Sequence, residues 1–232
     1  MKFFCLFLGF LSAYGYSETI VLNASAVGQA AYNSAGVVTG SGSGWTANLT
    51  INSNDYSPFG PGGSLRGWLK YDLSQIPDGS LINSASLSFT LGWNHTINSA
   101  FEVFRSSFDS WSNSGGFSFP SGDDGVISLN RISFNHFGAT ATQLYYESGK
   151  TYNIDLNPSS LSWGNDLLDN NISLQIKPTG ITDQQNQLTI SAAQSNAPQL
   201  IIVYTVPEPS AFSLSSIGIS ALFLLIKKKQ KT

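Results

Sequence analysis

Cysteine is nearly missing from this sequence of 232 residues, since the only one is Cys5. Cys5 lies in an N-terminal stretch that has the features of a cleaved leader, so the exported remainder is expected to contain no disulfide. A fold without such cross-links depends on its hydrophobic core. Roughly 190 residues between the two unusual termini are enough for one domain with a sizeable core.

Basic residues are also scarce in the middle of the chain. Between residues 17 and 205 there are six basic and 13 acidic residues, which gives this stretch a net charge of −7. An acidic domain without a basic patch repels phosphate backbones, so we expect no nucleic-acid partner. Neutral glycans and cations remain open as ligands.

Motifs for catalysis are missing as well. The sequence has no HExxH, GxSxG or P-loop, and its two histidines, His95 and His136, are far apart. We therefore expect a protein that is not an enzyme and that needs no cofactor. A Ser-His-Asp triad stays open as an alternative, because its members meet only in the folded protein.

Acidic residues leave two further alternatives. A polysaccharide hydrolase or lyase needs two carboxylates about 5–10 Å apart, and these could come from Glu102, Asp109, Asp123 or Asp124. Asp123 and Asp124, followed by Gly125, are also candidates for a structural Ca²⁺ site that uses backbone carbonyls. They lack the residue order of an EF-hand loop, and a solvated turn is the favoured explanation.

The first residues, 1–17, are typical of a signal peptide. Lys2 is followed by an almost wholly apolar run to Leu11 and then by small residues. Cleavage is expected after Gly15, with Ser17 as the alternative position. The sequence thus predicts export of the protein.

The last residues, 206–232, combine three features in a fixed order. Pro207, Glu208 and Pro209 form an extended neck, because proline cannot donate a backbone hydrogen bond. An uncharged run from 211 to 226 follows, about 24 Å long as a helix and able to span a membrane with local thinning. Four lysines then complete the chain and are expected to stay cytoplasmic.

This order resembles the PEP-CTERM sorting signal of Gram-negative bacteria. The resemblance implies recognition by exosortase, a membrane protease-transpeptidase, and an inner-membrane-anchored precursor that is passed to the cell surface or the extracellular matrix. It also implies an association with exopolysaccharide. An ordinary C-terminal membrane anchor is the alternative explanation of the same residues.

The stretch from 18 to 205 predicts an all-β domain, an antiparallel β-sandwich of jelly-roll-like type. Short β-rich runs recur between clusters of Gly, Asn, Pro and Ser, without long helical periodicity. A single helical turn is expected at Pro158, with Asn157 as its N-cap. Strands are expected at Thr19–Ala24, Gly67–Asp72, Ser84–Leu91, Phe101–Ser107, Gly125–Leu129, Gln143–Tyr146, Thr151–Asp155, Ile172–Pro178, Gln187–Ala192 and Gln199–Thr205.

Several segments of this domain are similar to the DNRLRE-type β-sandwich domains of bacterial surface proteins, which are relatives of some carbohydrate-binding modules. The matching segments are Gly67–Ser80 with Ile82–Phe89, Val103–Arg105 with Phe108–Ser112, Tyr152–Leu156 and Ala197–Tyr204. The segment after Trp111 departs from the pattern of that family. A ligand site that the family builds there is therefore in doubt for this chain.

Aromatic residues are the best candidates for ligand contact. Trp45 and Trp111 lie in Gly/Ser-rich segments that predict surface loops, and exposed Trp faces stack on sugar rings. Arg105 and Asp109 could bond the hydroxyl groups of such a ligand. Trp68 and Trp163 are expected in the core.

These patterns together predict a non-enzymatic surface or matrix protein with a structural or adhesive role near exopolysaccharide. A carbohydrate-binding module that uses loop aromatics is the alternative. A polysaccharide hydrolase or lyase is the third possibility considered.

Overall fold

The computed structural model describes residues 15–33, 37–43, 48–54, 63–92, 99–112, 119, 125, 127–129, 132–134, 149–160, 163–178 and 186–206. Most of the predicted leader, the Pro207–Glu208–Pro209 neck and the predicted membrane span lie outside these ranges. None of the helices within them is long and apolar enough to cross a membrane.

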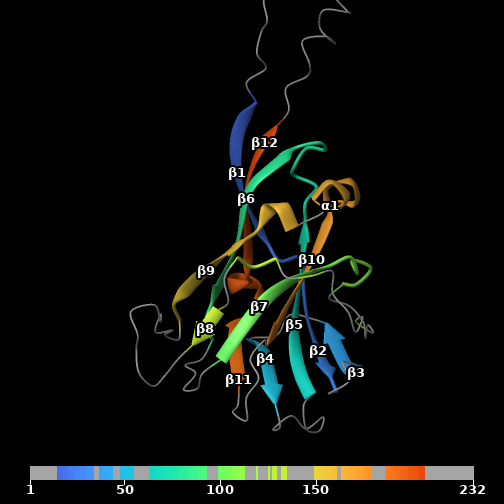
Figure 1. Cartoon of the computed structure of the whole chain (residues 1–232), viewed down its shortest axis with the longest axis vertical. Coiled ribbons are helices and arrows are strands. Elements are labelled where there is room, and N and C mark those ends of the chain that lie inside the picture. The colour runs from blue at the N-terminus through green and yellow to red at the C-terminus, as the bar shows by residue number, and fades with distance from the viewer. Residues whose placement is uncertain are drawn as a thin grey trace, which may run out of the picture.

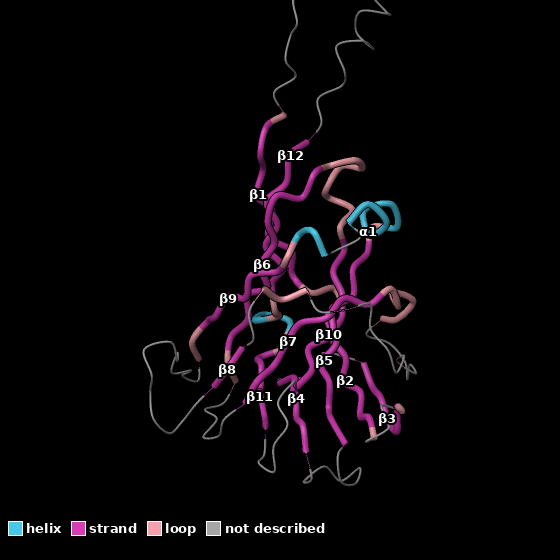
Figure 2. The backbone as a smooth tube through the Cα atoms, in the orientation of Figure 1, coloured by secondary structure: helices cyan, strands magenta, loops and turns pink. Residues whose placement is uncertain are grey.

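Strands dominate the domain, and helix is confined to short pieces (Figures 1 and 2). The strands are β1 (Tyr16–Asn23), β2 (Ala26–Tyr32), β3 (Val38–Ser43), β4 (Asn48–Asn54), β5 (Gly63–Asp72), β6 (Leu81–Thr90), β7 (Ser99–Ser106), β8 (Ile132–Phe134), β9 (Thr151–Leu156), β10 (Asn171–Pro178), β11 (Asn186–Ser191) and β12 (Gln199–Val206). The helical pieces are α1 (Trp163–Asp169) and two 3-10 turns, η1 (Pro158–Ser160) and η2 (Gln194–Asn196).

These strands form two antiparallel sheets, as predicted for a sandwich. The four-stranded sheet has the order β1-β12-β6-β9, and the eight-stranded sheet runs β11-β4-β5-β10-β7-β8, with β2 on β5 and β3 on β2. From β5 to β7 the chain alternates between the sheets, and β9 and β12 return to the four-stranded one.

The main core fills the space between the two sheets. In β6, Ala85, Leu87 and Phe89 face inward, as their alternation with serine predicts. The predicted turn before β6 contains Gly79 with a φ of 77°, a conformation that glycine adopts without strain. The predicted cap is also present, because Asn157 Oδ1 accepts a hydrogen bond from Ser159 N at 3.0 Å.

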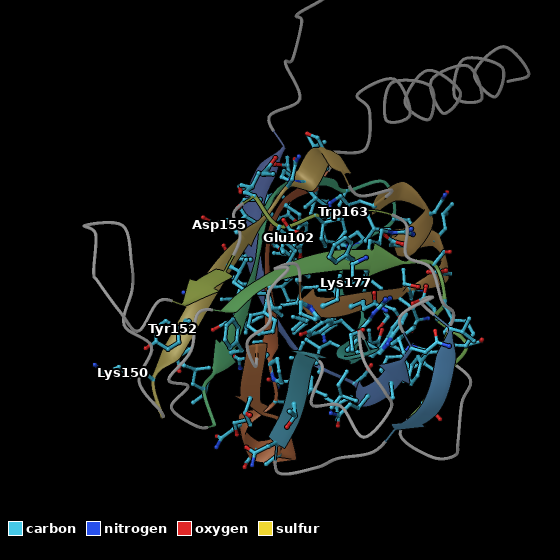
Figure 3. The ribbon with its side chains drawn as sticks, turned by 60° about the horizontal axis from the view of Figure 1, so that its bottom comes forward. Glu102, Lys150, Tyr152, Asp155, Trp163 and Lys177 are labelled. Carbon is cyan, nitrogen blue, oxygen red and sulfur yellow. The ribbon has the colours of Figure 1, made fainter. Side chains whose placement is uncertain are left out.

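Helix α1 contributes to the same core. Trp163, 6% exposed, lies among core side chains near this helix (Figure 3), and Leu167 on the next turn is also buried. The prediction of Trp163 as a core residue is confirmed. Trp68 is completely buried too, but on the opposite face of β5 from Leu69 and Tyr71.

That opposite face carries a second apolar group, which we call the outer cluster: Ala26, Ala30, Tyr32, Trp68, Trp111 and Phe119. The ring of Phe119 stacks on Trp68 with 4.7 Å between centroids. Small residues on β2 make room for these rings, since a Cβ placed on Gly28 would lie 2.7 Å from Phe119. The eight-stranded sheet is therefore buried on both of its faces in this region.

Several segments differ from the prediction. The Gly/Ser-rich stretch from 36 to 45 was predicted as a loop but contains β3, which obtains its hydrogen bonds from β2. Strands β2, β4 and β8 were not predicted, because Ala and Gly weaken the signal of β2, Asn weakens that of β4 and β8 has only three residues. The predicted strand at 125–129 amounts to one bridge between Ser128 and Leu156, and Gln143–Tyr146 lies outside the described ranges.

Strand β12 is almost wholly apolar from Leu200 to Tyr204, a pattern that predicts burial on both faces. Its burial instead alternates, with Leu200 and Ile202 inward and Ile201 and Val203 half-exposed on the outer face. The other sheet covers only the inner side of the four-stranded sheet. The outer side of this sheet is therefore accessible to ligands.

Candidate ligand-binding pocket

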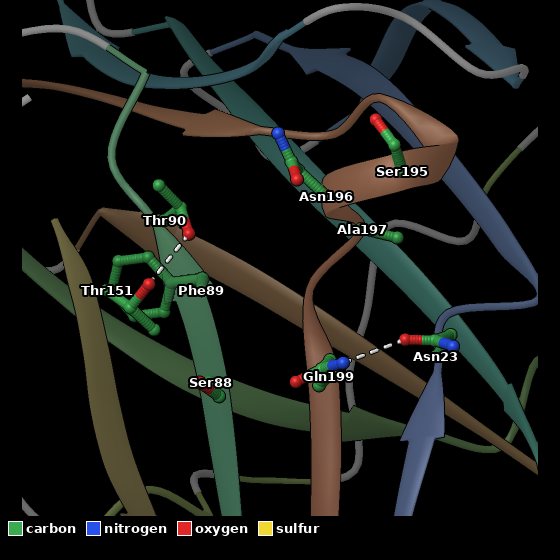
Figure 4. Close-up of a pocket in the computed structure, with 9 residues that line it drawn as sticks. All are labelled: Asn23, Ser88, Phe89, Thr90, Thr151, Ser195, Asn196, Ala197 and Gln199. Carbon is green, nitrogen blue, oxygen red and sulfur yellow. Dashed lines mark hydrogen bonds between the residues drawn. The ribbon is translucent and has the colours of Figure 1, made fainter. Parts of the chain in front are cut away.

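A pocket of about 150 Å³ lies on the outer side of the four-stranded sheet. It is open to one side and its walls come from four strands and from η2 (Figure 4). Nine residues line it: Asn23, Ser88, Phe89, Thr90, Thr151, Ser195, Asn196, Ala197 and Gln199.

Strand register brings the floor of the pocket together. Asn23 of β1 lies opposite Gln199 of β12, and Gln199 lies opposite Ser88 of β6. Thr90 of β6 lies opposite Thr151 of β9. Turn η2 precedes β12 directly, so Ser195 and Asn196 form a wall beside the floor (Figure 4).

Two hydrogen bonds between side chains fix the geometry of this pocket. Gln199 Nε2 donates to Asn23 Oδ1 at 3.0 Å, and the hydroxyls of Thr90 and Thr151 are 2.9 Å apart. These bonds leave Asn23 Nδ2 as a donor and Gln199 Oε1 as an acceptor for a ligand. The floor is thus already ordered before any ligand arrives.

The lining is polar but uncharged, because none of the nine residues has an ionisable side chain. Hydroxyl and amide groups can each donate and accept hydrogen bonds, which suits the hydroxyls of a neutral sugar. A volume of 150 Å³ equals that of about five water molecules at 30 Å³ each and thus suits a ligand group of the size of one sugar ring. Phe89 is 2% exposed, so its ring does not provide a stacking surface.

None of the nine lining residues provides a group for acid–base chemistry. General acid or base catalysis needs a side chain that gains or loses a proton, and a serine or threonine nucleophile needs such a base beside it. These nine side chains therefore offer hydrogen bonds to a ligand. Within the described ranges no group of three or more His, Cys, Asp and Glu is placed to hold a metal, and Asp123 and Asp124 lie outside those ranges.

Trp111 is not exposed, contrary to the expectation of a ligand contact. It is 1% exposed, its Nε1 donates to Ser173 Oγ at 2.9 Å, and its ring meets Phe119 edge-on at 5.2 Å. The cause is Gly28, whose missing side chain lets both rings approach β2. Trp45, the other predicted aromatic contact, lies outside the described residues.

Arg105 and Asp109 lie close to Trp111 but are occupied by structural contacts. The Arg105 side chain, 11% exposed, is ion-paired with Asp166 of α1. The backbone oxygen of Asp109 accepts a hydrogen bond from Lys70 Nζ at 2.5 Å, and that of Trp111 accepts one at 3.2 Å. Asp109 and Trp111 thus hold the segment after β7 against β5 and β10, whereas Arg105 joins β7 to α1.

Burial is the main cause of the pKa shifts of two carboxyl groups in this region. It raises the pKa of Asp109, and the hydrogen bond from Ser173 opposes that increase only in part. Burial likewise raises the pKa of Asp166, against the lowering effect of the Arg105 guanidinium. Since Asp166 is engaged by Arg105, these two acids do not form the free pair that glycoside cleavage requires.

None of the nine pocket residues was a predicted site residue. One signal in the sequence was available. Strand β6 has a hydroxyl-rich outer face, because its core residues alternate with Ser84, Ser86, Ser88 and Thr90. The partners of these residues come from distant parts of the chain. Only the strand register reveals which of them are neighbours.

Comparisons with known proteins add little to this geometry. No family model and no curated protein matches the chain. Among solved structures, the K1 cleaved adhesin domain of Lys-gingipain (Kgp) from Porphyromonas gingivalis W83 is similar, with 10% sequence identity and a TM-score of 0.28. The alignment covers 84% of this chain and 100% of that domain. A TM-score of this size constrains neither fold nor function.

Proposed function

We propose that this protein is an exported, non-enzymatic component of the bacterial surface or extracellular matrix that adheres to neutral polysaccharide. The observation that carries the proposal is the uncharged, hydrogen-bonding pocket on the outer side of the four-stranded sheet. A neutral exopolysaccharide matches this lining, since an anionic glycan would find no cation among the nine residues. The negative charge of the domain also disfavours anionic glycans.

The proposed route to the surface rests on the two ends of the sequence. The leader supports export, and the Pro207–Glu208–Pro209 neck, the apolar run and the lysines support sorting by an exosortase. Mass and location of the mature protein in its native host test this part. A surface form without the residues beyond Pro209 is expected, whereas a form that lacks only the leader and stays in the inner membrane contradicts sorting.

Binding is tested by affinity electrophoresis and calorimetry with a panel of neutral and anionic polysaccharides. We expect binding to a neutral member of the panel, weakened about 3- to 10-fold by Asn23→Ala or Gln199→Ala, because each removes about one hydrogen bond. Trp45→Ala tests in the same assay whether a loop aromatic contributes.

Asn83→Ala is the matched control for these variants. Asn83 Nδ2 donates to Thr205 Oγ1 at 2.8 Å in the same sheet but outside the pocket. Its replacement therefore removes a similar hydrogen bond without touching the ligand. Equal affinity of all three variants, or binding to anionic polysaccharides alone, contradicts the proposed site. Release of reducing ends from the polysaccharide contradicts the non-enzymatic role.

A further inference from the structure

Strand β1 forms an edge of the four-stranded sheet. It has eight residues, all paired with β12 without a register shift, and no other strand of the described fold pairs with it. Its second edge therefore presents unpaired backbone N–H and C=O groups over about 27 Å, at 3.4 Å per residue. An edge of this kind is a template for another strand.

The other described edges are shorter or covered. In the four-stranded sheet, Leu129 N donates to Asp155 O at 2.9 Å and Asn157 N donates to Ile127 O at 2.6 Å, so the free side of β9 is capped. In the eight-stranded sheet, the edge strands β3, β8 and β11 have six, three and six residues. Strand β1 is thus the longest edge that the described part of the chain leaves open.

The usual protections against strand pairing are missing from β1. Its sequence, YSETIVLN, has no proline, no lysine and no bulge. Its one charge, Glu18, accepts a hydrogen bond from Tyr204 OH at 2.6 Å. The side chains on the outer face, Ser17, Thr19, Val21 and Asn23, are all uncharged.

We propose that β1 pairs antiparallel with β1 of a second copy of this chain, joining two four-stranded sheets into one of eight strands. The proposal does not depend on the pocket or on its ligand. A symmetric pairing of this kind uses the same patch on both copies. Because the domain is acidic, two copies repel each other over most of their surface, and an uncharged strip is where they can meet.

Side-chain chemistry fits a register centred on Ile20. Thr19 of one copy then lies opposite Val21 of the other, and Ser17 lies opposite Asn23, which are favourable or neutral cross-strand pairs. On the inner face Ile20, which packs half-buried against the core, meets Ile20 of the second copy. Val21, 52% exposed in the single copy, becomes covered.

Cross-linking of the full chain in intact cells tests the pairing. Two tagged chains, Thr19→Cys and Val21→Cys, both with Cys5→Ser, are co-expressed and treated with a mild oxidant and a short thiol cross-linker. We expect a mixed dimer as the main product. Thr19→Cys dimers as the main product also support the pairing, since they indicate a register centred on Thr19.

Val37 supplies matched controls, because it is 54% exposed and lies outside β1. Val37→Cys is expected to cross-link only at background level. Val21→Lys is expected to lower the dimer fraction of the detergent-purified full chain about fivefold, since it places lysines diagonally across the interface, while Val37→Lys leaves it unchanged. Either of two results overturns the proposal. One is cross-linking at β1 that is no stronger than at Val37, and the other is a dimer fraction of Val21→Lys equal to that of the unsubstituted protein.

Discussion

Arg105 in β7 and Asp166 in α1 are joined by two hydrogen bonds between a guanidinium and a carboxylate. Arg105 Nε donates to Asp166 Oδ2 at 3.1 Å, and Nη2 donates to Oδ1. Both residues are buried, at 9% and 1% exposure. The pair joins α1 to β7 and fixes the helix over the end of the core.

Asp166→Ala is expected to lower the free energy of unfolding by about 3–5 kcal/mol, because it leaves the Arg105 cation buried and unpaired. Urea denaturation measures this change. Asp78→Ala, at an exposed turn, is the control and should stay within about 0.5 kcal/mol. A loss below about 1 kcal/mol for Asp166→Ala contradicts the structural role of the pair.

Asp109→Asn is expected to stabilise the protein at neutral pH. The pKa of Asp109 is raised by burial, so its proton stabilises the fold at a pH below about 3.9 and this contribution is lost as the pH rises through the raised value. Since the side chain is half-exposed, we expect a gain of about 0.5–1 kcal/mol at pH 7.

Urea denaturation at pH 3 and pH 7 measures this effect, and the gain should vanish at pH 3, where both side chains are neutral. Asp155→Asn, on an exposed position of β9, is the control and should show no such difference. Destabilisation by Asp109→Asn at pH 7 would falsify the assignment of burial as the main cause.

Gly28→Ala is expected to destabilise the domain by about 1–3 kcal/mol through overpacking. The added methyl would lie 2.7 Å from Phe119 and 3.3 Å from Trp111. Phe119→Leu removes the closer ring, so Gly28→Ala should cost less in that background. Thermal unfolding of the four proteins of this double-mutant cycle measures the coupling, and additive losses contradict the proposed contact.

Tyr204→Phe is expected to lower stability below about pH 10 and to make stability less dependent on pH on the alkaline side. The hydrogen bond to Glu18 raises the pKa of Tyr204 to about 12, and burial adds to it. The protonated hydroxyl thus stabilises the fold below about pH 10, and this contribution is lost as the pH rises through 12. Melting temperatures between pH 9 and 12 should fall less steeply for Tyr204→Phe, and curves of equal slope speak against this hydrogen bond.

Sequence patterns predicted those parts of the fold in which the local signal agrees with the final environment. Strand β6 alternates core residues with Ser or Thr from Ser84 to Thr90, and Trp163 was predicted as a core residue and is buried. Strand β2 could not be predicted in this way. Its small residues have low β propensity. They make space for the rings of Trp111 and Phe119, which lie about 80–90 positions further along the sequence.

The pocket was beyond the reach of sequence patterns for a related reason. Asn23 and Gln199 are 176 positions apart, yet they share a hydrogen bond because β1 and β12 are neighbours. Polar side chains on an outer sheet face are also common, so their types alone do not mark a site. The opposite error occurred at Trp111. Its Gly/Ser-rich segment predicted an exposed side chain, but the side chain is buried.

The position of β12 has a consequence for how the protein reaches its final state. This strand is the last of the fold in chain order, yet it lies between β1 and β6 and supplies both with backbone hydrogen bonds (Figure 1). Until residues 199–206 have emerged from a ribosome or a translocation channel, β1 has no neighbour and the four-stranded sheet has a gap at its centre. The four-stranded sheet, and the core that it covers, can therefore be completed only when the last strand of the described fold becomes available.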